Sequence, residues 1–215
     1  MTGNATVAVL GGTGPQGRGL AVRWAGVGVD VVLGSRDPQR ARAAAAEIGP
    51  GVRGVGNAEA AQEADIVVVA VPYDGHADTI ADVEQAVRGK ILIDCVNPLG
   101  FDKQGAFALE VPEGSAAQQA AALAPGARVV AAFHHVSSVL LLDPERELDI
   151  DVLVLGDDRE AADEVISLAD LVPGMRGVFA GRLRNAGQVE ALTANLISIN
   201  RRYKVHAGIR VTDLP

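Results

Sequence analysis

The chain has 215 residues, of which 48% are hydrophobic and 21% charged, and this composition predicts one globular domain with a sizeable core and excludes a disordered protein. Its formal net charge of −8 argues against a general binder of nucleic acid or anionic lipid. The single cysteine, Cys95, cannot form an intrachain disulfide, and with the four histidines it shows no spacing typical of a zinc site, so no structural metal is expected.

The N-terminal segment lacks the basic stretch of a signal peptide. The longest apolar runs fall far short of the ~20 residues of a membrane-spanning helix. We therefore expect a cytoplasmic chain that has no membrane partner.

Short apolar runs alternate with helical segments along the chain, which is the pattern of an α/β fold. Strands are predicted at residues 6–10, 29–33, 52–55, 66–71, 91–95, 128–132, 151–155 and 175–179. Helices are predicted at residues 17–26, 36–48, 58–64, 76–88, 115–123, 160–171 and 187–203. Repeated strand–helix units of this length predict right-handed crossovers and a Rossmann-like, doubly wound, mostly parallel sheet. The polar, glycine-bearing segment 100–114 is interpreted as a loop, either a lid or a surface excursion.

A domain boundary is expected after Ala180, with a Rossmann domain at residues 1–180 and a small helical C-terminal part at residues 181–215. Leu192, Leu196 and Ile199 lie at helical spacing in the last helix. That spacing fits packing in a homodimer as well as packing on the helix's own domain. From residue 182 to the end, six basic residues stand against two acidic ones, so this segment has the charge to hold small anions.

The first predicted strand runs directly into a glycine-rich turn that contains G-x-G-x-x-G at Gly12, Gly14 and Gly17. In a dinucleotide-binding turn, the first glycine permits the tight bend, the second lets a pyrophosphate approach the backbone, and the third lets the helix pack on the strand. Amides at the start of the helix then face the anion. The placement between strand and helix predicts a dinucleotide site.

The end of the second predicted strand indicates which dinucleotide is bound. Sites that prefer NAD place an acidic residue there, whereas this chain has Ser35 and Arg36, with Arg40 on the same face of the next helix. A hydroxyl and two guanidinium groups suit the 2′-phosphate of NADP. The alternative is that both arginines are ordinary exposed residues at a helix start, with Asp37 as the helix cap.

The same turn also satisfies G-x-x-G-x-x-G, the turn of short-chain dehydrogenases. Those enzymes need a lysine four residues after a tyrosine, but Ala77 follows Tyr73 and Ala207 follows Tyr203 at that spacing. A short-chain carbonyl reductase is therefore not favoured.

Several segments together resemble the NADPH-dependent reductases of the deazaflavin coenzyme F420. They are VAVLGGTGPQGRGLA at the start, GSR after the second strand, the VPY at residues 71–73, VVAAFHHVS at residues 129–137, LGDD at residues 155–158, and VEALT with a late GIR. The resemblance extends over nearly the whole chain. It implies a Rossmann domain that binds NADP(H), and a C-terminal part that completes a cleft where the deazaflavin stacks on the nicotinamide.

The same resemblance implies which residues hold the two ligands. NADP would be held by Thr13, Pro15 and Gln16 beside the glycines, by Ser35, Arg36 and Arg40, and by Val71 and Pro72 next to the nicotinamide. The deazaflavin, as the second substrate, would be bordered by Asn97, Pro98, His134, Val136, Ser138 and Ala207.

In such an enzyme both reacting atoms belong to cofactors, so no catalytic side chain is required. One proton must still be exchanged on the deazaflavin. His134 or His135 could supply or relay it, or water could, and a histidine that only shapes the pocket is the favoured interpretation. Cys95 is interpreted as a buried filler, and His76 as a solvated residue at a helix start.

Three functions follow, of which hydride transfer between NADP(H) and F420 is favoured. The first alternative is an NADPH-dependent reductase of another small substrate, such as an imine, a ketone or ferric ion. The second is a non-catalytic NADP(H) sensor. The residues alone support an NADP-binding oxidoreductase, and the resemblance adds the deazaflavin.

Overall fold

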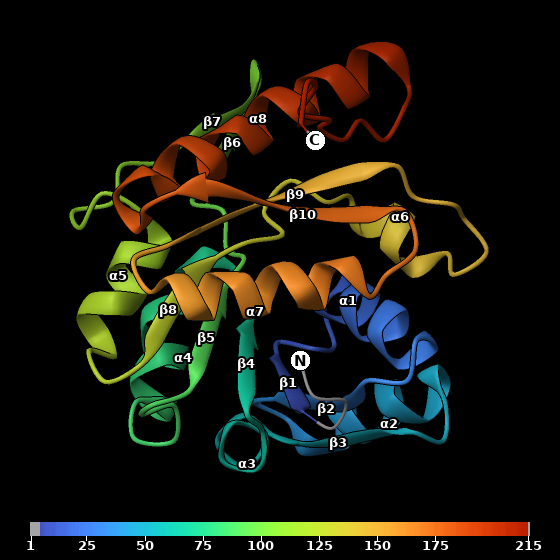
Figure 1. The fold of residues 1–215 in the computed structure, drawn as a ribbon, viewed down its shortest axis with the longest axis vertical. Coiled ribbons are helices and arrows are strands. Elements are labelled where there is room, and N and C mark those ends of the chain that lie inside the picture. Colours follow the sequence, from blue (N-terminus) through green and yellow to red (C-terminus); the bar gives the residue numbers. More distant parts are fainter. Residues whose placement is uncertain (1–4, 215) are drawn as a thin grey trace.

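The computed structural model describes residues 5–214, and its centre is an eight-stranded sheet with helices on both faces (Figure 1). The strands are β1 (Thr6–Leu10), β2 (Asp30–Ser35), β3 (Val52–Gly56), β4 (Ile66–Val69), β5 (Ile91–Asp94), β8 (Arg128–Ala131), β9 (Ile150–Gly156) and β10 (Met175–Gly181). Their order in the sheet is β10-β9-β8-β5-β4-β1-β2-β3. The chain starts in the middle, moves outward to β3 and returns to place β4 beside β1, so the winding direction reverses between β1 and β4.

The helices are α1 (Pro15–Gly26), α2 (Pro38–Ile48), α3 (Asn57–Glu63), α4 (His76–Val83), α5 (Ala116–Leu123), α6 (Ser138–Leu142), α7 (Arg159–Asp170) and α8 (Ala186–Tyr203). Successive strand residues face opposite sides, as β geometry requires. In β1, Val7 and Val9 pack in the core under α1, α2, α6 and α7. Ala8 and Leu10 pack in the core under α3, α4, α5 and the start of α8. Strands buried on both faces explain the continuous apolar runs in the sequence.

The prediction of a Rossmann-like, mostly parallel sheet with a C-terminal helix is confirmed. Within the eight-stranded sheet of the described residues, only β8 and β9 pair in the antiparallel direction, and β10 then pairs with β9 in the parallel direction. The ends of the elements differ from the prediction by a few residues. Strand β4 ends at Val69 and helix α4 at Val83, whereas the sequence predicted ends at residues 71 and 88.

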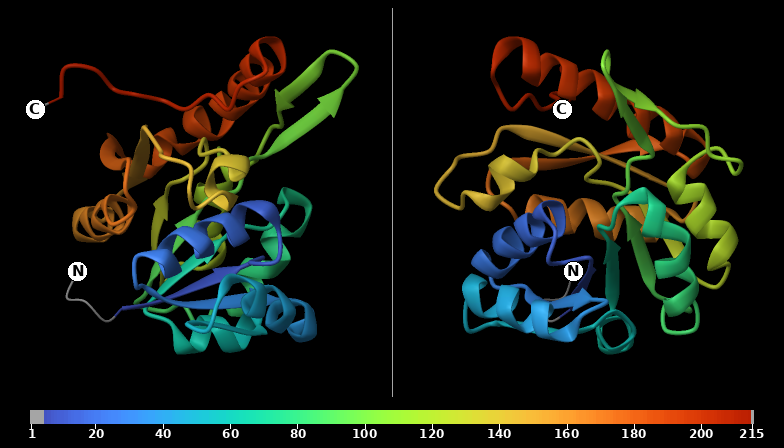
Figure 2. Two further views of the ribbon diagram at one scale, coloured as in Figure 1. Left: turned by 90° about the vertical axis from the view of Figure 1, so that its right-hand side faces the viewer. Right: turned by 180° about the vertical axis from the view of Figure 1, so that it is seen from behind.

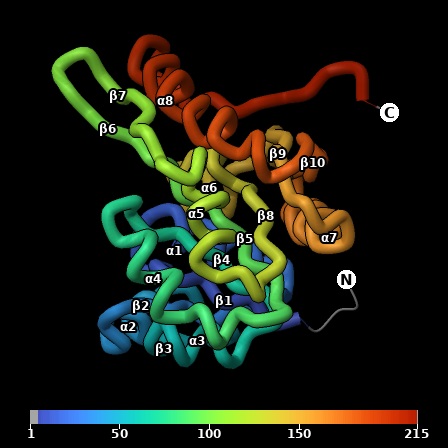
Figure 3. The backbone as a smooth tube through the Cα atoms, turned by 90° about the vertical axis from the view of Figure 1, so that its left-hand side faces the viewer, coloured from blue at the N-terminus to red at the C-terminus, as the bar shows by residue number. Residues whose placement is uncertain are grey.

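The predicted loop at residues 100–114 is partly wrong, because it contains a hairpin of β6 (Leu99–Asp102) and β7 (Gly105–Ala108). The hairpin projects from the body of the molecule alongside α8, as Figures 2 and 3 show from two sides. The short helix α6 was also not predicted, since its five residues are too few for a helical period to be visible.

Within residues 5–214, no helix combines the length and the apolar character that a bilayer crossing requires.

Candidate functional site

The glycine turn after β1 has two glycines that are needed for packing and one that faces open space. A Cβ at Gly12 would lie 2.9 Å from the carbonyl oxygen of Val9, and a Cβ at Gly17 would lie 2.9 Å from that of Gly11. A Cβ at Gly14 would meet only the Gly11 oxygen, at 3.4 Å. Gly14 is also the N-cap of α1, so the backbone there is free to receive a ligand at the positive end of a helix.

A cavity of about 430 Å³ lies beside this turn, at the carboxyl ends of β1, β2 and β4. We call it the switch-point cavity, because α/β sheets bind ligands where the winding direction reverses. It is lined by Gly11, Thr13, Gly14, Ser35, Arg36, Asp37, Arg40, Asn57, Ala70, Val71, Pro72, Asp74, Gly75, Asp78 and Thr79. Seven of the predicted NADP residues therefore come together in one cavity, namely Thr13, Gly14, Ser35, Arg36, Arg40, Val71 and Pro72. The other four, Gly12, Pro15, Gln16 and Gly17, do not line it.

Two arginines that follow β2, Arg36 and Arg40, are available to bind a ligand. The carboxylate of Asp37 accepts hydrogen bonds from the backbone amides of Gln39 (2.9 Å) and Arg40 (3.4 Å), which caps α2. Neither Arg36 nor Arg40 forms a salt bridge with a described residue. Asp37, the acidic residue nearest to these arginines in sequence, thus caps the helix. Both guanidinium groups fit a phosphate.

Three segments meet at a neighbouring strand end, which we call the Asn97–His134–Thr193 junction. The Asn97 Nδ2 atom donates to the backbone oxygen of His134 over 2.8 Å, and the Thr193 hydroxyl donates to the same oxygen over 3.1 Å. The junction joins the segment after β5, the segment after β8 and the last helix. Thr193 was not singled out from the sequence, because its role depends on contacts between residues that lie 59 positions apart.

The segment after β8 is also held by the glycine turn and carries an unusual backbone conformation. The Gln16 amide donates to the backbone oxygen of Phe133 over 3.1 Å. Phe133 has a φ of 64°, in the left-handed region that side chains with a Cβ seldom adopt. Such strain persists where surrounding contacts fix the chain, and it is common at functional sites. Gln16 therefore links the glycine turn to the segment after β8.

The remaining residues predicted to border the deazaflavin are less directly connected to the junction. Pro98 and Val136 are buried, and Ser138 is the first residue of α6. The backbone amide of Ala207 donates to the Asn200 side chain over 2.6 Å. No hydrogen bond between described residues links Ser138 or Ala207 to the junction.

The His134 ring is well suited to shape a pocket and poorly suited to carry a proton. Its residue is 3% exposed, and neither ring nitrogen has a hydrogen-bond partner among the described residues. Burial lowers the pKa of His134 to about 4, and burial likewise lowers that of His135 to about 4. The His135 Nε2 atom accepts from the backbone amide of Leu153 over 3.2 Å. Both imidazoles are neutral near pH 7.

The interpretation of His76 as a solvated residue is wrong, because its side chain is fully buried. Its Nε2 lies 2.6 Å from Asp94 Oδ2, and its Nδ1 lies 2.9 Å from Gln119 Oε1. Burial alone would lower the pKa of His76, but the hydrogen bond and charge of Asp94 outweigh it and raise the pKa. Cys95 is buried as expected, with its Sγ 2.9 Å from the backbone oxygen of Val69, and burial raises its pKa.

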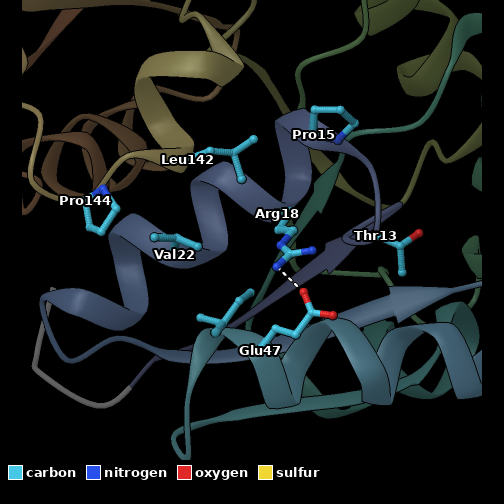
Figure 4. Close-up of a pocket in the computed structure, with 8 residues that line it drawn as sticks. Thr13, Pro15, Arg18, Val22, Glu47, Leu142 and Pro144 are labelled. Carbon is cyan, nitrogen blue, oxygen red and sulfur yellow. Dashed lines mark hydrogen bonds and ion pairs between the residues drawn. The ribbon is translucent and has the colours of Figure 1, made fainter.

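A second cavity of about 560 Å³ opens between α1, the end of α2 and the segment after α6 (Figure 4). Thr13 and Pro15 lie at one end of it and Pro144 at the other, with Leu142 between them. Arg18 is ion-paired with Glu47 across it. Because this cation is already neutralised, the switch-point cavity is the better site for a phosphate-bearing ligand.

The chain is similar to known proteins over nearly its whole length. Residues 6–98 match a family model described as "NADP oxidoreductase coenzyme F420-dependent". The F420-dependent NADP reductase of Methanothermobacter marburgensis is 39% identical, and the alignment covers 97% of this chain and 99% of that protein. The F420-dependent NADP reductase of Methanothermobacter thermautotrophicus is 40% identical, with 97% and 95% covered. A crystal structure from Arthrobacter sp. FB24, described as a candidate F420-dependent NADP reductase, has a TM-score of 0.82 at 28% identity and covers 97% of this chain and all of that one.

Proposed function

The chain belongs to the family of F420-dependent NADP reductases, and on that premise we propose that it transfers a hydride between NADP(H) and the deazaflavin coenzyme F420. One observation from the structure supports this most strongly. The switch-point cavity presents an open glycine together with Arg36 and Arg40, neither of which forms a salt bridge with a described residue, and this set of groups fits a phosphate-bearing dinucleotide.

We assign the switch-point cavity to NADP(H). Gly14 and the start of α1 would receive the pyrophosphate, because a Cβ is absent there and helix amides face the anion. Ser35, Arg36 and Arg40 would hold the 2′-phosphate. Val71 and Pro72 would border the nicotinamide, and the resemblance of the VPY segment supports that placement.

The deazaflavin is assigned to the Asn97–His134–Thr193 junction, with Pro98, Val136, Ser138 and Ala207 as further bordering residues. In this assignment, residues 181–215 are the part that completes the cleft of the Rossmann domain at residues 1–180. Thr193 supports it, because α8 reaches the strand ends through that hydroxyl. A homodimer and a cytoplasmic location stay predictions from the sequence.

When bound, NADP(H) supplies or accepts a hydride at C4 of its nicotinamide, and C5 of the deazaflavin is the other reacting atom. The reduction of F420 by NADPH also takes up one proton. The side chains orient the two rings and exclude water, and such positioning can contribute ~7–11 kcal/mol to lowering the barrier. A neutral, buried His134 fits a residue that shapes the pocket, so solvent is assigned as the source of the proton.

The function is tested by mixing the protein with NADPH and F420 and following the visible absorbance of the oxidised deazaflavin. We expect that absorbance to decay only when both compounds are present. An absorbance that stays constant at saturating concentrations would overturn the proposal. Turnover of NADPH with an imine, a ketone or a ferric chelate would then indicate the first alternative, and binding of NADPH without any turnover would indicate the sensor.

A further inference from the structure

A groove separate from the two sites above lies between the β6–β7 hairpin and the second half of α8. It encloses about 560 Å³, and its walls include Phe101, Gln104, Ile197, Ser198, Arg201 and Arg202. We call it the hairpin groove. Figures 2 and 3 show the hairpin and α8 rising side by side from the body of the molecule.

One face of α8 connects this groove to the junction. Thr193, Ile197 and Arg201 are four residues apart, so they form a single stripe along the helix. Thr193 bonds to the backbone oxygen of His134, whereas Ile197 and Arg201 line the groove. At 1.5 Å per residue, Arg201 lies about 12 Å along the helix from Thr193. The wall of the groove that the hairpin forms is also connected to the junction, because β6 begins two residues after Asn97.

The charged residues that line the groove are two arginines and one aspartate. Neither Arg201 nor Arg202 makes a salt bridge with a described residue. Lys103 and Lys204 belong to the same two segments. Asp102 lines the groove, but its Oδ1 accepts from the backbone amides of Gln104 (2.7 Å) and Gly105 (3.1 Å) in the hairpin turn.

We propose that the hairpin groove binds the acidic tail of the deazaflavin substrate, an inference that rests on the proposed function. In F420 the ring carries a ribityl phosphate that is extended by glutamate residues, so the substrate is a ring with a polyanionic chain. With the ring at the junction, the chain follows the stripe from Thr193 to Arg201. Guanidinium groups pair well with carboxylates and phosphates, and the apolar side chains of Phe101 and Ile197 line the same groove.

The test compares two deazaflavins that differ only in the tail. One is F420, and the other is its chromophore with the ribityl chain alone, without phosphate or glutamates. The dissociation constant of each is measured by equilibrium binding, and KM and kcat by turnover with NADPH. The variant is the double substitution Arg201→Gln and Arg202→Gln. The control is Arg42→Gln, which removes an exposed arginine from α2 at the other end of the molecule (Figure 1).

We expect the double variant to weaken F420 binding roughly tenfold or more, with a matching rise in its KM. Its kcat, its KM for NADPH and its affinity for the tail-less compound should stay as in the wild type. Added salt should weaken binding of F420 more than binding of the tail-less compound. Arg42→Gln should change none of these values by more than about twofold.

Two results would overturn the inference in different ways. If the double variant binds F420 as the wild type does, or loses both compounds equally, the groove does not hold the tail. If the wild-type protein binds and turns over neither deazaflavin, the proposed function fails and this inference fails with it.

Discussion

The carboxylate of Glu190 on α8 accepts a hydrogen bond from the backbone amide of Ala116, at the start of α5, over 2.9 Å. A second bond comes from the amide of Ala117 over 3.1 Å. Glu190 is 2% exposed and lies one turn before Thr193 on the same helix. This side chain therefore anchors α8 to α5. It also fixes the position from which Thr193 hydrogen-bonds to His134.

The first prediction concerns how stability depends on pH through Glu190. Burial raises its pKa from 4.5 to about 7. As pH rises from 5 to 8, the unfolded chain ionises this group more readily than the folded protein does, so the free energy of unfolding falls by roughly 2 kcal/mol from this residue. Glu190→Gln cannot ionise, so this fall should disappear in urea denaturation at the two pH values. Glu110→Gln, at an exposed position, should keep the wild-type difference, and a wild-type slope in Glu190→Gln would refute the assignment.

The second prediction separates the two roles of the motif glycines. A Cβ at Gly14 meets no atom closer than 3.4 Å, whereas a Cβ at Gly17 lies about 3 Å from three atoms. Gly14→Ala should keep the wild-type melting temperature within a few degrees but weaken NADPH binding at least about tenfold, because the methyl group occupies the approach of the pyrophosphate. Gly17→Ala should lower the melting temperature instead. If a folded Gly14→Ala variant binds NADPH as tightly as the wild type does, the cofactor does not bind in the switch-point cavity.

The third prediction tests the choice of cofactor. Arg36→Ala removes a guanidinium group that lines the switch-point cavity and has no acidic partner among the described residues. We expect KM for NADPH to rise about tenfold, since a charge-assisted hydrogen bond is worth ~1.5–3 kcal/mol. KM for NADH should hardly change. Arg42→Ala, at an exposed position on the following helix α2, is the control, and equal losses for both nucleotides in Arg36→Ala would contradict a 2′-phosphate site.

The fourth prediction concerns the C-terminal segment that carries Ala207. Asp151 is fully buried and accepts hydrogen bonds from Arg176 (two of 2.8 Å), Arg210 (3.1 Å) and the backbone amide of Val211 (2.6 Å). Asp151→Asn should lower the free energy of unfolding by about 2 kcal/mol and speed amide exchange near Val211. Asp149→Asn, at an exposed position, should have little effect.

Asp151 also determines how the stability of the protein should change at acidic pH. The hydrogen bond from Arg176, with the other contacts, lowers the pKa of Asp151 from 3.8 to about 2. Its stabilisation is therefore complete above pH ~4 and is lost as pH falls toward 2. Between these pH values the wild type should lose more stability than Asp151→Asn, and parallel curves would show that the carboxylate is not held by these contacts.

Much of this fold is readable from local sequence, for reasons seen in particular elements. Strand β4 is a continuous apolar run because both of its faces are buried, and Gly12 and Gly17 are required by contacts with Val9 and Gly11, a few residues away. The hairpin of β6 and β7 was missed because Phe101 and Phe107 are exposed, so its strands bury no regular apolar face.

Sequence reasoning groups residues most easily where one short segment supplies several of them, as at Ser35 and Arg36, which both line the switch-point cavity. Contacts are missed where the partner is far away in sequence. His76 is buried because Asp94 and Gln119 meet it from other elements, and Thr193 reaches a carbonyl 59 positions away. Local patterns carry no information about such pairs.

The central claim is direct hydride transfer between two ligands held side by side, and isotope transfer tests it most directly. NADPH that carries deuterium at the transferred position of C4 is mixed with the protein and F420 in ordinary water, and the reduced deazaflavin is analysed by mass spectrometry. We predict that one deuterium per turnover appears at C5 of the deazaflavin. Reduced deazaflavin without deuterium, or no reduction at all, would contradict the account.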